Sequence, residues 1–153
     1  MSPENDLTHA RFRVTASWSP GEKKGRLESE NAVLACAHAG APELGGIGGA
    51  ANPEELLAAA VSACFVQTWT IFLEKLKVPI EAPRVTAACT IEKDPAGGFR
   101  VTRIAVAPHV SAALWESRRA DVEKTVQLAE KYCIVSKAVK GDGSVVAVKP
   151  EVS

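Results

Sequence analysis

The stretch NPEELLAAAVSACF, residues 52–65, decides the fold. Asn52 is a favourable N-cap residue, Pro53 suits the first helical position, and two glutamates follow at the positive end of the helix dipole. The apolar residues from here to about Lys77 point in nearly every direction around a helix. Because a helix that is apolar all round is buried on most sides, the sequence predicts a long central helix covered by other elements.

The segments on either side of this helix alternate apolar and polar residues, which is typical of half-buried strands. A second helix is predicted from about Leu114 to Tyr132. Strands and helices do not alternate strictly, so we predict an α+β fold with antiparallel sheets packed on the central helix. The predicted strands are 11–19, one or two strands within 26–37, the hairpin 84–94 and 99–110, and 144–152.

The composition indicates a globular protein with no preference for a charged partner. The chain has 153 residues, which suits a single domain, 1–153. Lys plus Arg is 18 and Asp plus Glu is 18, and no block of like charge stands out, so nucleic acid and anionic membrane are not expected partners. With 46% hydrophobic residues and no net charge, the chain favours an oligomer.

The sequence contains no segment that we identify as a leader or a membrane span. The first residues, MSPENDLTHARF, are polar and carry two acids, which does not fit a signal peptide. The longest apolar stretch, 56–73, is interrupted by polar side chains and is expected to fall short of a membrane span. We therefore predict a soluble, cytoplasmic protein.

The four cysteines are too far apart for a CxxC metal or redox motif. In a reducing cytoplasm they are buried structural residues, a catalytic pair, or both. Cys64 and Cys133 each lie on the apolar face of a predicted helix, so these two thiols can meet if the helices pack together. The residue type alone favours a plain packing role for any single cysteine. The cysteines are Cys36, Cys64, Cys89 and Cys133.

A reactive thiol needs a lowered pKa, which requires positive charge or hydrogen-bond donors nearby. Cys64 lies three turns into its helix, beyond the reach of the helix dipole, so we expect a cation from elsewhere. The turn GEKKGR, 21–26, offers Lys23, Lys24 and Arg26. Glu54 could orient such a cation, or it could serve only the positive end of the helix dipole.

Other kinds of site lack residues that they need. His38 follows Cys36 by two positions on a predicted strand, but two ligands do not make a zinc site. A Cys–His hydrolase would need a histidine near Cys64 and a third group to orient it, and no spacing suggests this. We predict no metal and no bound cofactor.

The first stretch together with a downstream one, AEKYCIVSKAVKG at 129–141, resembles the OsmC and organic hydroperoxide resistance family. The preceding loop ELGGIGG, 43–49, is similar to the organic hydroperoxide resistance branch, and the likeness covers about 25–149. The resemblance implies an OsmC-like fold and an intertwined homodimer with two active sites at the subunit interface. It also implies a thiol peroxidase that reduces organic hydroperoxides.

The resemblance also assigns roles to individual residues. Cys64 matches the peroxidatic cysteine, which becomes a sulfenic acid, and Cys133 matches the resolving cysteine, which forms a disulfide with it. Glu54 matches the glutamate that holds the catalytic arginine. The place of that arginine is taken by Lys23, with Arg26 three residues later. A partner protein that carries dihydrolipoyl groups is the implied reductant, and neither a metal nor a tightly bound cofactor is implied.

The chain departs from the family pattern in ways that leave alternatives open. The OsmC branch has its arginine before the helix motif, where this chain has Leu44, so the cation is Lys23, Arg26 or a partner-chain residue such as the partner's Arg103. Ile134 stands where the family often has proline. The alternative function is a binding or redox-sensing protein on the same fold, without peroxidase activity. Two further cysteines have no counterpart in the motifs and are interpreted as structural thiols, Cys36 and Cys89.

Overall fold

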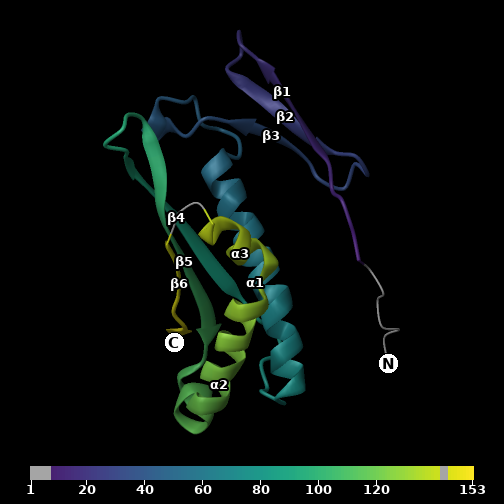
Figure 1. The fold of residues 1–153 in the computed structure, drawn as a ribbon, viewed down its shortest axis with the longest axis vertical. Coiled ribbons are helices and arrows are strands. Elements are labelled where there is room, and N and C mark those ends of the chain that lie inside the picture. The colour runs from purple at the N-terminus through teal and green to yellow at the C-terminus, as the bar shows by residue number, and fades with distance from the viewer. Residues whose placement is uncertain (1–7, 142–144) are drawn as a thin grey trace. The chain divides into compact units, whose positions relative to one another are not determined.

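The computed structural model describes residues 8–141 and 145–153, and the chain divides into two compact units, 1–53 and 54–153 (Figure 1). The first residues of the segment tested above for a leader, and Ser144 at the start of the last predicted strand, lie outside the described residues.

The N-terminal unit holds a three-stranded antiparallel sheet in the order β1-β2-β3. Its strands are β1 (Val14–Ser19), β2 (Lys24–Ser29) and β3 (Ala35–Ala39), and a 3-10 turn, η1 (Pro42–Leu44), follows. The segment 26–37 thus contributes to two strands, which was one of the two predicted alternatives.

The two faces of this sheet differ in polarity. On one face, register places Ala16 beside Leu27 and Leu27 beside Cys36, with Trp18 on the same side. Within this unit the apolar face is largely uncovered: Trp18 is 52% exposed, and most of β1 is exposed. The prediction that β1 is half-buried is therefore wrong for this unit, because the described residues of the unit form a single layer.

The C-terminal unit begins with helix α1 (Pro53–Lys75) and continues into the predicted hairpin of β4 (Val85–Lys93) and β5 (Phe99–Val110). Two short strands, β6 (Val145–Val148) and β7 (Glu151–Val152), pair with β5 in parallel. Antiparallel pairing thus holds for β1 to β3 and for β4 with β5. The last strands are parallel because the chain returns along the helices before it rejoins the sheet.

The two remaining helices are α2 (Ala112–Tyr132) and α3 (Ile134–Lys140). The Ser111 hydroxyl caps α2 by accepting a hydrogen bond from the Leu114 N–H at 3.3 Å. The segment after Cys133 forms the seven-residue helix α3.

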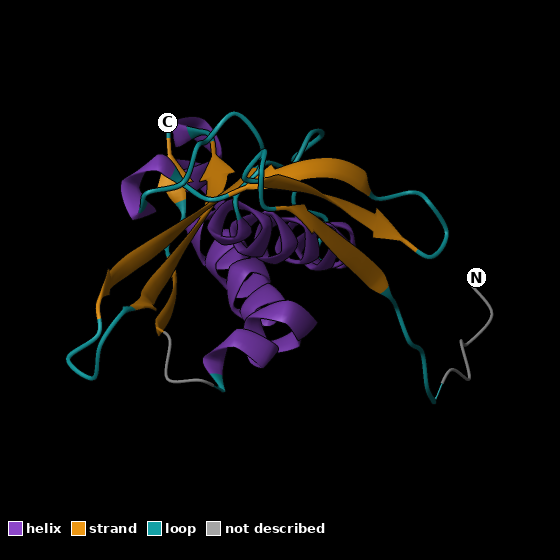
Figure 2. Ribbon diagram, turned by 90° about the horizontal axis from the view of Figure 1, so that it is seen from above, coloured by secondary structure: helices purple, strands orange, loops and turns teal. Residues whose placement is uncertain are grey.

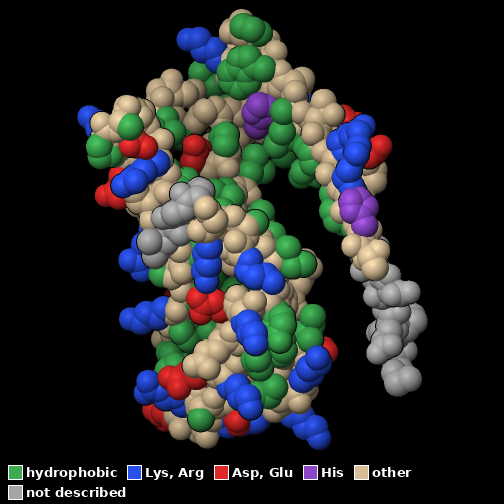
Figure 3. Space-filling view, viewed as in Figure 1, with side chains coloured by type: hydrophobic (Ala, Val, Ile, Leu, Met, Phe, Trp, Pro, Cys, Tyr) green, Lys and Arg blue, Asp and Glu red, His purple; other side chains and the backbone are tan. Residues whose placement is uncertain are grey.

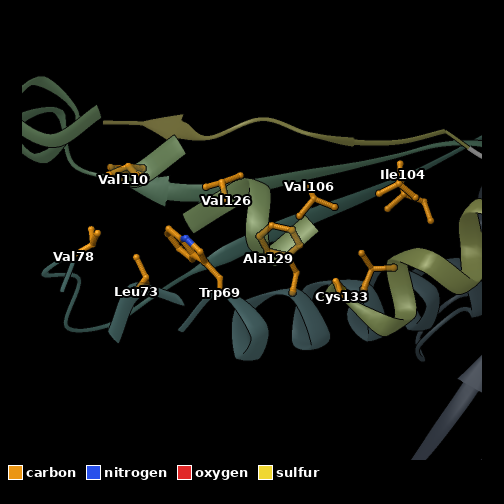
Figure 4. Packing of buried hydrophobic residues seen from close by; sticks show 13 residues of the cluster. Trp69, Leu73, Val78, Ile104, Val106, Val110, Val126, Ala129 and Cys133 are labelled. Carbon is orange, nitrogen blue, oxygen red and sulfur yellow. The ribbon is translucent and has the colours of Figure 1, made fainter. Parts of the chain in front are cut away.

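Helices α1 and α2 cover one face of the sheet and form the core with it (Figures 2 and 4). Buried and partly buried residues alternate along the second half of β5, so one face of this strand is covered more fully than the other. On α2 the apolar row Val122, Val126 and Ala129 is buried throughout. The Trp69 indole N–H in the middle of the core donates to the Thr125 hydroxyl at 2.9 Å, which satisfies both buried polar groups. The buried row of α1 is Val61, Phe65, Trp69 and Leu73.

The rest of α1 is less buried than the sequence suggests. Ala63 and Gln67 are exposed, and Ile71 is 49% exposed. By length and composition alone α1 is also apolar enough to cross a membrane, so the expectation that its polar residues rule this out is wrong. Because one whole row of the helix packs into the core, α1 serves as the core helix of a soluble unit.

Arg118 joins the far ends of α1 and α2. Its guanidinium donates to the carbonyl oxygens of Lys77 at 2.5 Å and Leu76 at 3.3 Å, and its Nε donates to Asp121 at 3.0 Å. Backbone carbonyls at the end of a helix have no partner within the helix. Arg118 therefore supplies hydrogen-bond donors to the two residues that directly follow α1. The backbone of Arg118 itself leaves the helical region, which kinks α2 at this point.

Candidate active site

The thiols of Cys64 and Cys133 are in contact. Cys64 lies in the middle of α1, and Cys133 lies in the single-residue link between α2 and α3. The Cys133 S–H donates a hydrogen bond to the Cys64 sulfur, and both cysteines are reduced. Cys133 is completely buried in the core cluster, where Figure 4 labels it, whereas Cys64 is partly exposed. The arrangement leaves one thiol open to a small molecule and keeps the second directly behind it.

Backbone and side-chain donors surround the Cys64 sulfur. Burial by itself raises the pKa of Cys64, but the N–H of Val135, the Cys133 thiol, the N–H of Ile134 and the Thr68 hydroxyl together bring it below its ordinary value. The two N–H groups belong to the first turn of α3, where backbone donors have no partner within the helix. The expectation that a cation must activate Cys64 is therefore incomplete, because backbone donors contribute as well.

The pKa of Cys133 moves in the opposite direction. Burial raises it, and the neighbouring Cys64 raises it further, while the Ser136 hydroxyl, which donates to the Cys133 sulfur at 3.1 Å, lowers it in part. Environments that separate the pKa values of two neighbouring groups assign them different roles. The lowered pKa of Cys64 and the raised pKa of Cys133 therefore favour ionisation of Cys64 before Cys133.

Glu54 lies in the first turn of α1, as predicted. Its Oε2 is buried and accepts no hydrogen bond within the described residues. Burial raises the pKa of Cys89 on β4, and the negative charge of Glu54 raises it further, which places the carboxylate close to that strand. A buried carboxylate oxygen without a donor is unfavourable, so the site fits an additional cation or donor.

The two candidate cations belong to the N-terminal unit. Lys23 lies in the turn between β1 and β2 with a φ of 53°, an unusual conformation for a residue other than glycine. Arg26 lies on β2, on the polar face of the sheet, and its Nε is 3.7 Å from Glu28 Oε2. Both side chains of that ion pair are more than half exposed, so it is weak.

Two hydroxyl groups at the thiols escaped the sequence analysis. The Thr68 hydroxyl donates to the Cys64 carbonyl at 2.9 Å and also lowers the pKa of the thiol. Ser136 contacts Cys133 as described. Thr68 follows Cys64 by four residues and Ser136 follows Cys133 by three, spacings that place side chains on the same side of a helix. From the sequence, this spacing could have predicted that both hydroxyl groups lie near the cysteines.

His38, considered above as a zinc ligand, makes a hydrogen bond and a ring contact within the N-terminal sheet. Across residues 8–141 and 145–153, no group of three or more His, Cys, Asp or Glu side chains is arranged to hold a metal ion. His38 Nε2 donates to the Ser17 carbonyl at 2.9 Å, and its ring contacts Trp18 at 5.6 Å between centroids. This histidine therefore has a structural place in the N-terminal sheet. Gly25 lies beneath the ring, where a Cβ would come within 2.5 Å of His38 Nε2.

Comparison with known proteins places these cysteine-bearing helices in a family. Residues 46–149 match the family model described as OsmC-like protein, which spans both cysteine motifs. The chain belongs to the OsmC-like family. An organic hydroperoxide resistance protein-like 2 of Staphylococcus epidermidis is 32% identical over 138 residues, which covers 89% of this chain and 93% of that protein. A related protein of Staphylococcus aureus is 27% identical over 128 residues, 84% of this chain and 88% of that protein.

Solved structures of OsmC-like proteins share the fold. An organic hydroperoxide resistance protein of Legionella pneumophila has a TM-score of 0.75 at 29% identity, with 94% of this chain and 97% of that chain covered. A counterpart from Elizabethkingia anophelis has a TM-score of 0.73 at 28% identity, covering 95% and 97%. An OsmC-like protein of unknown function from Vibrio cholerae reaches 0.78 at 16% identity, covering 94% and 100%, a likeness of fold alone. The OsmC-like fold predicted from the sequence is confirmed.

Proposed function

We propose that this OsmC-like protein is a cysteine-based thiol peroxidase that reduces organic hydroperoxides. One observation carries the proposal: Cys64 is a partly exposed thiol with a lowered pKa, and Cys133 donates a hydrogen bond to it. Low-pKa, accessible cysteines next to a second cysteine are the arrangement that redox-active thiols use. Its relatives are named organic hydroperoxide resistance protein or organic hydroperoxide resistance protein-like, and these names point to the same class of substrate.

In the first step the Cys64 thiolate attacks the outer oxygen of the hydroperoxide. The O–O bond breaks, the alcohol leaves with a proton taken from the medium, and Cys64 becomes a sulfenic acid. In the second step Cys133 attacks the Cys64 sulfur, the S–S bond forms, and the hydroxyl leaves as water with the Cys133 proton. Capture as a disulfide protects Cys64 from further oxidation.

A dithiol completes the cycle by reducing the Cys64–Cys133 disulfide, and its own two sulfurs end as a disulfide. Dihydrolipoyl groups on a partner protein are the reductant that the family resemblance implies, and we extend that expectation to this chain. The cycle uses two cysteines and an external dithiol, so we propose neither a metal nor a bound cofactor.

The surroundings of Cys64 favour an apolar peroxide. Cys64 packs against the core cluster, together with Leu57 and Phe72 on the same helix. Water is excluded from such a surface, whereas an alkyl or lipid chain gains from contact with it. We expect organic hydroperoxides to react faster than hydrogen peroxide.

Glu54 is proposed to hold a cation at the site, because its Oε2 is buried without a partner within the described residues. Lys23 and Arg26 are the candidates. Lysine provides a single point charge, whereas arginine can hold a carboxylate with two parallel hydrogen bonds. Substitution of each, described in the Discussion, decides between them.

We further propose a cytoplasmic homodimer. Large apolar side chains are exposed in both units, among them Trp18 at 52% and Ile71 at 49%. Exposed apolar surface of this kind marks protein interfaces. The viewed face of residues 54–153 in Figure 3 mixes Lys and Arg with Asp and Glu, which gives no support to nucleic acid as a partner. Sedimentation of the purified protein at the mass of a dimer tests the assembly, and a monomer at all concentrations contradicts it.

Turnover of cumene hydroperoxide with a dithiol reductant tests the function. Cys64→Ser should abolish turnover, whereas Cys36→Ser should retain it, because the proposed cycle uses only Cys64 and Cys133. Undiminished turnover in Cys64→Ser would remove the basis of the proposal and favour the alternative, a binding or redox-sensing protein without peroxidase activity.

A further inference from the structure

Ser136 is a fully buried hydroxyl that lies against the sulfur of Cys133. Its Oγ donates to Cys133 Sγ at 3.1 Å, and the exposed fraction of the residue is 0%. A buried hydroxyl needs a hydrogen-bond partner, and a neutral sulfur is a weak acceptor. Hydrogen bonds to charged acceptors are much stronger. The contact is therefore most favourable when Cys133 carries a negative charge.

Two successive hydrogen bonds at the thiols run in the same direction, from Ser136 through Cys133 to Cys64. The Ser136 hydroxyl donates to the Cys133 sulfur, and the Cys133 S–H donates to the Cys64 sulfur. Because the hydroxyl approaches the Cys133 sulfur as a donor, it leaves the S–H of Cys133 free to point at Cys64. This direction of the donors favours ionisation of Cys64 over ionisation of Cys133 in the reduced protein.

Formation of the disulfide requires a negative charge on the sulfur of Cys133. Cys133 must lose its proton as it attacks the Cys64 sulfenic acid, and that proton leaves with the hydroxyl as water. The titratable group that opposes a charge on Cys133 in the resting state is the neighbouring Cys64 of α1. This opposition ends when Cys64 becomes a neutral sulfenic acid, and the Ser136 hydroxyl of α3 stays in place to receive the charge.

We propose that Ser136 is a positioning residue for disulfide formation: its hydroxyl stabilises the Cys133 thiolate as that thiolate attacks the oxidised Cys64. This inference rests on the proposed peroxidase cycle and assigns Ser136 to its second step alone. Ser136→Ala should leave the oxidation of Cys64 unchanged and slow the formation of the disulfide. Sulfenic acid should then accumulate and proceed more readily to sulfinic acid.

A single-turnover experiment separates the two steps. Reduced protein is mixed with cumene hydroperoxide, and Cys64 oxidation and Cys64–Cys133 disulfide formation are followed by quenching and mass spectrometry over a range of pH. For Ser136→Ala we expect disulfide formation that is slower by about tenfold or more, the factor that a lost hydrogen bond to a charged group produces. We also expect the pH dependence of that step to move to higher pH. Ser136→Thr, which keeps the hydroxyl, should restore both.

A matched control identifies a purely structural effect. Thr125 is also a fully buried hydroxyl, and it donates to the Val122 carbonyl at 2.7 Å. Thr125→Val should leave the rate and the pH dependence of disulfide formation unchanged. An unaltered disulfide step in Ser136→Ala overturns the inference, as does an equal slowing of both steps in Ser136→Ala and Thr125→Val.

The inference and the proposed function fail differently. If the wild-type protein forms no disulfide with peroxide, the peroxidase cycle is wrong. The role of Ser136 is then tested by titrating the Cys133 thiolate through its ultraviolet absorbance, in a variant with serine at the other three cysteines. Removal of the Ser136 hydroxyl should raise the pKa of Cys133 in this background, and an unchanged titration overturns the inference.

Discussion

The backbone N–H of Val135 donates a hydrogen bond to the sulfur of Cys64. The donor belongs to the first turn of α3, and the sulfur belongs to the middle of α1, so the contact depends on how these helices pack. A backbone donor cannot be removed by changing its side chain. Backbone hydrogen bonding therefore lowers the pKa of Cys64 in addition to any cation that Glu54 holds.

The lowered pKa of Cys64 predicts its reactivity with pH. The thiolate is populated above the lowered pKa and is lost as the pH falls through it, so alkylation of Cys64 should persist at a lower pH than that of a free cysteine, whose pKa is about 8.5. Measuring iodoacetamide labelling of Cys64 against pH by mass spectrometry checks this. The matched comparison is Cys89, whose pKa is raised and whose labelling should begin at higher pH. A Cys64 midpoint at or above that of a free cysteine would speak against activation.

Ile134→Pro should weaken the activation without breaking the fold. Ile134 is the first residue of α3 and is 73% exposed, and proline suits the first position of a helix while lacking an N–H. Loss of this donor should raise the pKa of Cys64 and lower its thiolate fraction at neutral pH by up to about tenfold. Ile134→Ala keeps the N–H and should behave like the wild type. Equal titration of Cys64 in the proline and alanine variants would exclude a contribution from this backbone group.

Substitution identifies the cation that Glu54 holds. Glu54→Gln should lower kcat/KM by about tenfold or more, since an interaction with a charged partner is lost. Of Lys23→Ala and Arg26→Ala, the one that removes the partner should cause a similar loss and should add little to Glu54→Gln in the double variant. Additive losses would show that the residue acts independently of Glu54. Full activity in both single variants would exclude both candidates and turn attention to the partner's Arg103.

Arg118 should stabilise the C-terminal unit through the end of α1. Arg118→Ala removes donors to the carbonyls of Leu76 and Lys77, and we expect the free energy of unfolding to fall by about 1–3 kcal/mol. The neighbouring Arg119→Ala is the control. Its pair with Glu123 is an exposed ion pair, so its loss should cost no more than about 1 kcal/mol. Urea denaturation of both variants measures the difference, and equal stabilities would show that the contacts of Arg118 contribute little.

The fold was largely predictable because its signals are local. The start of α1 at Pro53, the hairpin of β4 and β5, and the buried stripe of α2 follow from capping residues and apolar periodicity. The parallel pairing of β6 with β5 was missed, because it depends on the path of the chain through two helices. The exposed part of α1 was missed because composition does not say which side of an apolar helix finds a neighbour.

The candidate site was predictable in its cysteines and less so in what acts on them. Apolar periodicity places Cys64 and Cys133 each on the apolar face of a predicted helix. The two motifs that contain them together resemble one family. The donors at Ile134 and Val135 are backbone N–H groups, so the residue types at these positions do not predict them. Their effect comes from tertiary packing that brings the start of α3 against α1. Glu54 was predicted, but only the structure shows that its Oε2 is buried and accepts no hydrogen bond from the residues described.

The most direct test of the mechanism is to map the disulfide that forms when the reduced protein meets a stoichiometric amount of an organic hydroperoxide. Peptide mass spectrometry should find Cys64 joined to Cys133, with Cys36 and Cys89 still free. In Cys133→Ser the same treatment should give a sulfenic acid on Cys64 that passes to sulfinic acid with excess peroxide. Wild-type protein in which Cys64 stays reduced, or is oxidised without bonding to Cys133, would contradict the mechanism.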